Sequence, residues 1–306
     1  MYELNQRLAN NEVVLIDGAT GTELEVLGAA MVDNAWCAMA SLTDPDALKV
    51  VHTANIEAGA ELIIANTFAS SRHVLERAGC GKHFEQLNTV SIELARQARD
   101  AVAAATGQEP VPVAGSISTT QQGGAHPPIE VSTANFADQV RLQAEAGADL
   151  FVLEMMRELE QTEAILDAIQ ATGLPVWVGW SCVIDDEGEV WLWSQEHRLA
   201  EALAATEDRS IDVAAVMHTE VDDIDRCIDV MTEHWDGPIG IYAHTGYFEP
   251  PKWVFNNTIS PEAYAEACLA WVSRGVQVIG GCCGIGPAHM RHLRSILPEK
   301  LAHRPG

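Results

Sequence analysis

The chain has 306 residues, of which 47% are hydrophobic and 20% charged, a balance typical of a globular protein with a large core. Its net charge of −26 opposes binding to nucleic acids and to anionic membrane surfaces, because such binding depends on Lys and Arg side chains that neutralise phosphates. No apolar run approaches the roughly 20 residues of a membrane-spanning helix. The N-terminus lacks a signal-peptide pattern and the seven cysteines are an odd number, so we expect a cytoplasmic protein with reduced thiols.

Eight short apolar and β-branched runs recur along the chain, separated by helix-like stretches. They are residues 13–17, 62–68, 111–117, 150–156, 175–181, 213–219, 239–245 and 276–282. Near-continuous apolar strands that alternate with helices indicate a parallel sheet covered by helices, and eight such units predict an α/β protein with a single (β/α)8 TIM barrel, one domain over residues 1–306. An open, doubly wound sheet is the alternative, but the loop from Asp17 to Glu23 lacks its glycine-rich fingerprint.

The eighth run ends in two glycines, the adjacent cysteines Cys282 and Cys283, and Gly284. Neighbouring cysteines on a strand cannot easily bond to each other, because their side chains point to opposite faces. Glycines let the backbone turn so that both thiolates converge on a soft cation such as Zn²⁺. The alternative is two small apolar residues that fill a tight corner.

The chemistry of such barrels lies at the C-terminal ends of the strands. Polar or reactive side chains stand at each of the eight predicted ends. They are Asp17, Gly18, Asn66, Thr67, Ser116, Glu154, Trp180, Ser181, Cys182, Met217, His218, His244, Cys282 and Cys283.

These residues resemble the homocysteine S-methyltransferase family, which includes betaine-homocysteine methyltransferases and the homocysteine-binding module of methionine synthase. The resemblance covers nearly the whole chain. It rests on residues 17–24, 66–68, Gly115, Ser116, Glu154, residues 280–284, Pro287 and His289. In that family, the two final cysteines and one earlier cysteine bind zinc, and the zinc binds the sulfur of homocysteine.

The resemblance implies a zinc enzyme that activates a thiol, because a metal-bound thiol loses its proton and can attack a methyl group on a positively charged sulfur or nitrogen. It also implies that Asp17 and Glu154 hold the amino group of the substrate. Gly18 and Thr67 would lie near its carboxylate. Asp17 could instead cap the loop that follows it, and Glu154 could pair with an arginine.

The sequence departs from the family at the sixth strand, where His218 stands in place of the first zinc cysteine. We expect His218, Cys282 and Cys283 to hold the metal and to leave one position open. His244, where the family has asparagine, could be a general base, a fourth ligand or a hydrogen-bonding residue. Cys182 is a further candidate ligand and ranks below His218.

The methyl donor is expected to meet an aromatic face, for which Trp36 and Trp180 are the candidates. Betaine-using relatives carry tyrosines where this chain has Ala69 and Met155, so a sulfonium donor is favoured over betaine. We therefore predict a zinc-dependent S-methyltransferase that moves a methyl group from a sulfonium or quaternary ammonium donor to homocysteine or a related small thiol. The alternatives are a metal-dependent hydrolase or lyase, and a non-catalytic barrel with a closed metal site. The sequence leaves a homo-oligomer open.

Overall fold

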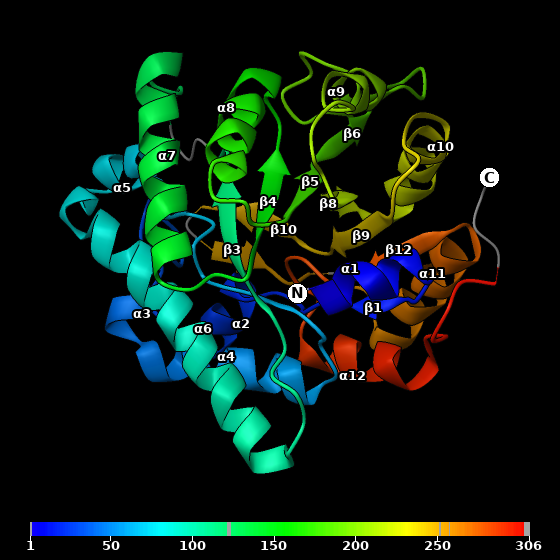
Figure 1. Ribbon diagram of the computed structural model, residues 1–306, viewed down its shortest axis with the longest axis horizontal. Coiled ribbons are helices and arrows are strands. Elements are labelled where there is room, and N and C mark those ends of the chain that lie inside the picture. Colours follow the sequence, from blue (N-terminus) through cyan, green and yellow to red (C-terminus); the bar gives the residue numbers. More distant parts are fainter. Residues whose placement is uncertain (1, 121–123, 251, 257, 303–306) are drawn as a thin grey trace.

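The computed structural model describes residues 2–120, 124–250, 252–256 and 258–302. At its centre lies a sheet of eight parallel strands in the order β1-β12-β9-β8-β5-β4-β3-β2 (Figure 1). The strands are β1 (Val14–Leu15), β2 (Ile63–Ile64), β3 (Val113–Ser118), β4 (Leu150–Met156), β5 (Val176–Trp180), β8 (Val213–Glu220), β9 (Ile239–His244) and β12 (Val276–Ile279). Each overlaps one of the eight predicted runs, which confirms the strand assignment.

The two outer strands of this sheet also meet. The backbone N–H of Glu61 donates to the carbonyl of Leu15 at 2.7 Å, and that of Asp17 donates to the carbonyl of Leu62 at 3.0 Å. These bonds join β1 to β2, so the sheet closes on itself. The predicted (β/α)8 barrel is confirmed.

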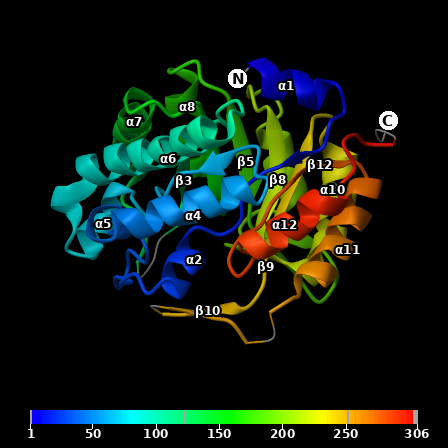
Figure 2. The same cartoon turned by 90° about the horizontal axis from the view of Figure 1, so that it is seen from below.

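Helices surround the barrel in both ribbon views (Figures 1 and 2). They are α1 (Tyr2–Ala9), α2 (Gly21–Val26), α3 (Ala40–Thr43), α4 (Pro45–Glu57), α5 (Arg72–Arg77), η1 (Gly81–His83), α6 (Phe84–Thr106), α7 (Ile129–Glu145), α8 (Leu159–Gln170), α9 (Leu199–Ala205), η2 (Val221–Asp223), α10 (Ile224–His234), α11 (Pro261–Ser273) and α12 (Pro287–Ile296). No helix in the described parts of the chain has the length and apolar character needed to cross a membrane.

Two hairpins that the sequence pattern did not predict follow barrel strands. One pairs β6 (Cys182–Ile184) with β7 (Val190–Leu192), and the other pairs β10 (Tyr247–Glu249) with β11 (Lys252–Val254). Figure 2 places β10 and α1 at opposite ends of the barrel. The second hairpin therefore lies at the end where the strands finish.

The strands alternate between an inner and an outer core. In β5, Trp177 packs inside the barrel, whereas Val176, Val178 and Trp180 pack between the sheet and the helices. Leu4 of α1 joins the inner cluster, so α1 closes the N-terminal end. An inner residue near the C-terminal end of a strand therefore faces the other end of the barrel, away from α1.

The buried His52 on α4 makes stability depend on pH. Its side chain is completely buried, and neither ring nitrogen has a hydrogen-bond partner among the described residues. Burial lowers its pKa from 6.5 to about 4. The unfolded chain therefore binds a proton that the folded protein excludes, and stability falls as pH drops from about 6.5 toward 4.

We expect His52→Leu to remove this loss. The free energy of unfolding of the variant, relative to that of the wild type, should rise by ~2 kcal/mol between pH 7 and pH 5. Urea unfolding at both pH values measures the difference. His234→Leu, at an exposed position on α10, is the matched control and should leave the pH dependence unchanged. Equal pH dependence in wild type and His52→Leu would contradict the assignment.

Candidate active site and metal centre

A pocket lies where the barrel strands end. The sequence-predicted residues that line it are Asp17, Gly18, Trp36, Asn66, Glu154, Met217, His218, Cys282 and Cys283. Its other lining residues include Cys37, Phe68, Thr120, Met155, Tyr242, Phe248 and Trp253. The C-terminal strand ends thus bring residues from the first to the eighth barrel strand together.

His218, Cys282 and Cys283 form a compact group of soft ligand atoms. The Sγ of Cys282 lies 3.6 Å from Nδ1 of His218 and 3.9 Å from Sγ of Cys283, and the three ligand atoms lie within 4.8 Å of one another. A tetrahedral Zn²⁺ with bonds of about 2.0–2.3 Å separates its ligand atoms by roughly 3.5–3.8 Å. The donor types and the two separations from Cys282 therefore fit a zinc ion.

The two thiols also differ in acidity. The hydrogen bond between the two thiols holds the pKa of Cys282 well below its usual value against the opposing effect of burial, and His218 acts in the same direction. The same bond and burial raise the pKa of Cys283 well above its usual value.

The backbone after β12 explains why both cysteines face the pocket. The N–H of Cys282 donates to the carbonyl of Ala243, and the carbonyl of Cys283 accepts from Thr245, both at 2.9 Å. Gly284 follows with a φ of 77°, and a Cβ there would lie 2.4 Å from the carbonyl oxygen of Thr245. Only glycine fits this turn, which ties the cysteine pair to the end of β9.

His218 reaches the pocket through a break in the strand pattern. Met217 faces the inner core, so simple alternation would turn His218 outward. The pairing of β8 with β9 shifts register between Met217 and Glu220, and His218 has a φ of 45°. Ser181 donates to the carbonyl of His218 at 2.9 Å and holds this turn. Left-handed backbone at a non-glycine residue is typical of functional sites.

His244 lies beside this group but outside it. Its ring is 4.5 Å from that of His218, and its Nε2 lies 3.0 Å from Oε1 of Glu220. Among the described residues, the metal-ligand group has only the three members named above, which does not support a fourth ligand from His244. Cys182 is also excluded as a ligand, because its buried thiol interacts with Cys227 in the outer core.

Two carboxylates face the same pocket, the buried Asp17 and the half-buried Glu154. Asp17 accepts from the N–H of Ile64 at 2.8 Å, and Glu154 accepts from the hydroxyl of Ser116. Burial raises the pKa of Asp17 well above its usual value and that of Glu154 to about 8. No Lys or Arg forms an ion pair with either carboxylate in the described part of the chain, so a cationic ligand would stabilise their charged forms.

Gly18 lies next to Asp17 in the pocket lining. A Cβ at this position would approach the carbonyl oxygen of Ile285 to 2.4 Å, and the N–H of Gly18 donates to Asn55 at 3.0 Å. The backbone after β1 is therefore packed directly against the turn that follows Cys283. A side chain at position 18 would separate the two.

The prediction that Thr67 lies near the substrate carboxylate is wrong. Its hydroxyl donates to the carbonyl of Ser116 at 2.8 Å and accepts from the N–H of Ser116 at 2.9 Å. The residue is fully buried, and its own N–H donates to Ala65. Thr67 thus joins β2 to β3 and offers no group to a substrate carboxylate.

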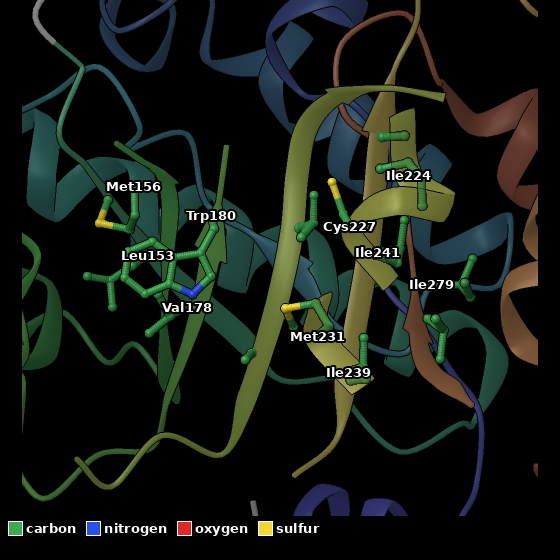
Figure 3. Close-up of a cluster of buried hydrophobic side chains, with 14 of the residues drawn as sticks. Leu153, Met156, Val178, Trp180, Ile224, Cys227, Met231, Ile239, Ile241 and Ile279 are labelled. Carbon is green, nitrogen blue, oxygen red and sulfur yellow. The ribbon is translucent and has the colours of Figure 1, made fainter. Parts of the chain in front are cut away.

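Trp180 lies outside the pocket. Figure 3 shows its indole beside Leu153, Met156 and Val178, in the outer core. The reason is the alternation along β5, which turns Trp177 into the barrel and Trp180 toward the helices. The prediction that Trp180 faces a methyl donor is wrong.

Four aromatic residues instead form one side of the pocket, here called the aromatic wall: Trp36, Phe68, Phe248 and Trp253. The Trp36 ring lies 6.4 Å from those of Phe68 and Phe248, and Phe248 lies 6.4 Å from Trp253. Trp253 also lies 5.7 Å from the ring of His218. Only Trp36 had been singled out from the sequence, although the cluster of aromatic residues at 247–253 was the available signal.

Tyr242 is another pocket residue that the sequence argument missed. It points inward from β9, and its buried hydroxyl has no hydrogen-bond partner among the described residues. A Cβ at Gly179 would lie 2.4 Å from this hydroxyl, so the glycine makes room for it. Position within β9 was the available signal, since every second residue faces the barrel interior.

The fold and the site together describe a barrel protein whose pocket, at the C-terminal ends of the strands, holds two thiols and an imidazole. The family model described as homocysteine S-methyltransferase matches residues 14–297. The chain therefore belongs to the homocysteine S-methyltransferase family, and its activity is methyl transfer to a thiol, as predicted.

Individual relatives are similar over nearly their whole lengths. Homocysteine S-methyltransferase 1 of Zea mays is 25% identical, covering 94% of this chain and 95% of the relative. Selenocysteine Se-methyltransferase of Brassica oleracea var. italica is 24% identical, covering 94% and 89%. The metallated form of the homocysteine methyltransferase MmuM from Escherichia coli has a TM-score of 0.80 at 23% identity, covering 95% and 99%. This structural similarity supports the barrel fold.

Proposed function

We propose that this protein is a zinc-dependent S-methyltransferase that moves a methyl group from a sulfonium or quaternary ammonium donor to homocysteine or a related small thiol. The observation that carries the proposal is the group of His218, Cys282 and Cys283, whose ligand atoms lie within 4.8 Å of one another in the pocket. These three residues would hold the ion. A bound zinc would supply a thiol-binding position at which the acceptor loses its proton.

We propose that Asp17 and Glu154 bind the ammonium group of the acceptor. Both carboxylates are held by hydrogen bonds from the protein, Asp17 to a backbone N–H and Glu154 to Ser116. An ammonium group between them would offset the cost of burying two negative charges. Gly18 would lie near the acceptor carboxylate. The names of the relatives, which act on homocysteine and selenocysteine, support an amino acid with a thiol or selenol.

We propose that the aromatic wall receives the methyl donor. Aromatic ring faces attract sulfonium and quaternary ammonium cations, and the attraction strengthens where water is excluded. Trp253 of this wall lies 5.7 Å from the ring of His218. A donor at the wall would therefore be close to the acceptor sulfur. His244, paired with Glu220, would support this side of the site.

We also propose that residues 1–306 form one domain. All eight barrel strands belong to one sheet, and β1 pairs with β12 across nearly the whole chain. The pocket takes residues from both ends of the sequence, from Asp17 to Cys283. A cut between the halves of the barrel would therefore divide the site.

Purified protein tests the function directly. It should contain about one zinc per chain by mass spectrometry. Incubation with homocysteine and a panel of S-methylmethionine, dimethylsulfoniopropionate and betaine should yield methionine, with the sulfonium donors ahead of betaine. A zinc-loaded protein that methylates neither homocysteine nor another small thiol with any of these donors would overturn the proposal.

A further inference from the structure

Glu25, on α2 at the edge of the pocket, contacts two members of the aromatic wall. Its Oε1 accepts from the indole N–H of Trp36 at 2.5 Å. The backbone N–H of Trp253 donates to both of its oxygens, at 2.9 Å to Oε2 and 3.2 Å to Oε1. One carboxylate therefore joins the loop that carries Trp36 to the hairpin that carries Trp253, although 228 residues separate Glu25 from Trp253.

The hairpin needs such an attachment. Its strand β10 is exposed along its whole length, and a two-stranded hairpin is marginally stable by itself. The buried Trp253 anchors it from within, because its indole N–H donates to the carbonyl of Thr245 at 2.9 Å. Glu25 holds the same residue by its backbone. Together these bonds fix the position of Phe248 and Trp253 over the pocket.

Trp36 is held in an equally defined place. It has a φ of 41°, a conformation that non-glycine residues adopt only where the surroundings impose it. Its ring lies against Gly21, where a Cβ would approach the ring to 2.3 Å. Its edge contacts with Phe68 and Phe248 complete the packing. The hydrogen bond to Glu25 therefore fixes the N–H edge of the indole.

We propose that Glu25 is the positioning residue of the methyl-donor subsite. Its carboxylate holds Trp36 and Trp253 together in the aromatic wall and makes the wall selective for a cation. The inference rests on the proposed function, since it assigns the donor to this wall. A carboxylate that accepts from an indole N–H lies at the ring edge and adds negative potential to the ring, and this strengthens the attraction of the ring faces for a sulfonium or trimethylammonium group. Glu25 itself need not touch the donor.

Two substitutions separate the hydrogen bonds from the charge. Glu25→Ala removes both, whereas Glu25→Gln keeps a carbonyl oxygen that accepts from Trp36 and Trp253. Loss of a hydrogen bond to a charged group typically lowers affinity about 10-fold or more. We expect Glu25→Ala to raise the donor KM by at least about 10-fold. The homocysteine KM should change less than about 2-fold and the zinc content should stay the same, and Glu25→Gln should fall between Glu25→Ala and the wild type. Glu249→Ala, an exposed acid on the same hairpin, is the matched control.

Direct binding tests the cation preference without turnover. Choline and its neutral carbon isostere 3,3-dimethylbutanol are titrated against each protein by calorimetry, and the wild type should prefer choline. Glu25→Gln and Glu25→Ala should lose most of this preference. Unchanged preference and donor KM in Glu25→Ala, or an equal rise in the donor and homocysteine KM, would overturn the inference.

The same titration separates this inference from the proposed function. Choline binding that depends on Glu25, in a protein that methylates no thiol, would overturn the function and support the cation subsite. Methyl transfer in a protein whose Glu25→Ala variant binds choline as the wild type does would overturn the subsite alone.

Discussion

Replacing His218 with alanine is expected to remove most of the zinc and to lower methyl transfer at least about 100-fold. The reason is that only two thiolates would remain, and even the loss of a residue that merely supports a metal ligand costs about 10- to 100-fold in affinity or activity. The measurements are zinc per chain after dialysis against a chelator and the initial rate of thiol methylation. Full zinc content in His218→Ala would remove His218 from the ligand group.

His218→Cys is the matched variant. It places a cysteine where the family carries one, so that the site again has three thiolates. This variant should keep about one zinc per chain. Its site carries one more negative charge than the wild type, so the acceptor thiolate should be more nucleophilic and the chemical step faster. Cys268→Ala, at a buried cysteine of α11 outside the pocket, should match the wild type in both measurements.

The barrel was predictable because its strands are buried on both faces. Such strands appear as continuous apolar runs, and β4 (Leu150–Met156) coincides with its predicted run at both ends. β1 and β2 are shorter than predicted, because Asp17 and Asn66 already belong to the loops that shape the pocket. The pattern thus identifies the scaffold and, where a strand stops early, the start of the site.

Side-chain direction was less predictable, and the outcome depended on whether the strand stayed regular. Glu154 faces the pocket and Trp180 the outer core, and alternation within each strand accounts for both. His218 breaks that rule through a positive φ, which no residue pattern announced. The hairpin that brings Phe248 and Trp253 back over the pocket depends on a contact with Glu25, 228 residues away from Trp253, as well as on the nearby Thr245.

Glu154→Gln is expected to lower kcat/KM for homocysteine at least about 30-fold, while affecting a thiol without an amino group far less. Removing one partner of a buried charge pair costs about 2–5 kcal/mol, which corresponds to a factor of roughly 30 or more. Glutamine is nearly isosteric and still accepts from Ser116, so the fold and the zinc content should be preserved. Homocysteine and 4-mercaptobutanoate, which lacks only the amino group, are compared by steady-state kinetics.

The ratio of the two kcat/KM values isolates the ammonium contact from every other effect of the substitution. The wild type should favour homocysteine strongly, and Glu154→Gln should bring the two thiols close together, because burial makes the Glu154 carboxylate costly to ionise without a cation beside it. Glu160→Gln, at an exposed position on α8, should leave the ratio unchanged. If Glu154→Gln slowed both thiols equally, its carboxylate would be acting on the thiol or the metal group, and the ammonium would have to be bound elsewhere, with Asp17 as the remaining buried acid of the pocket.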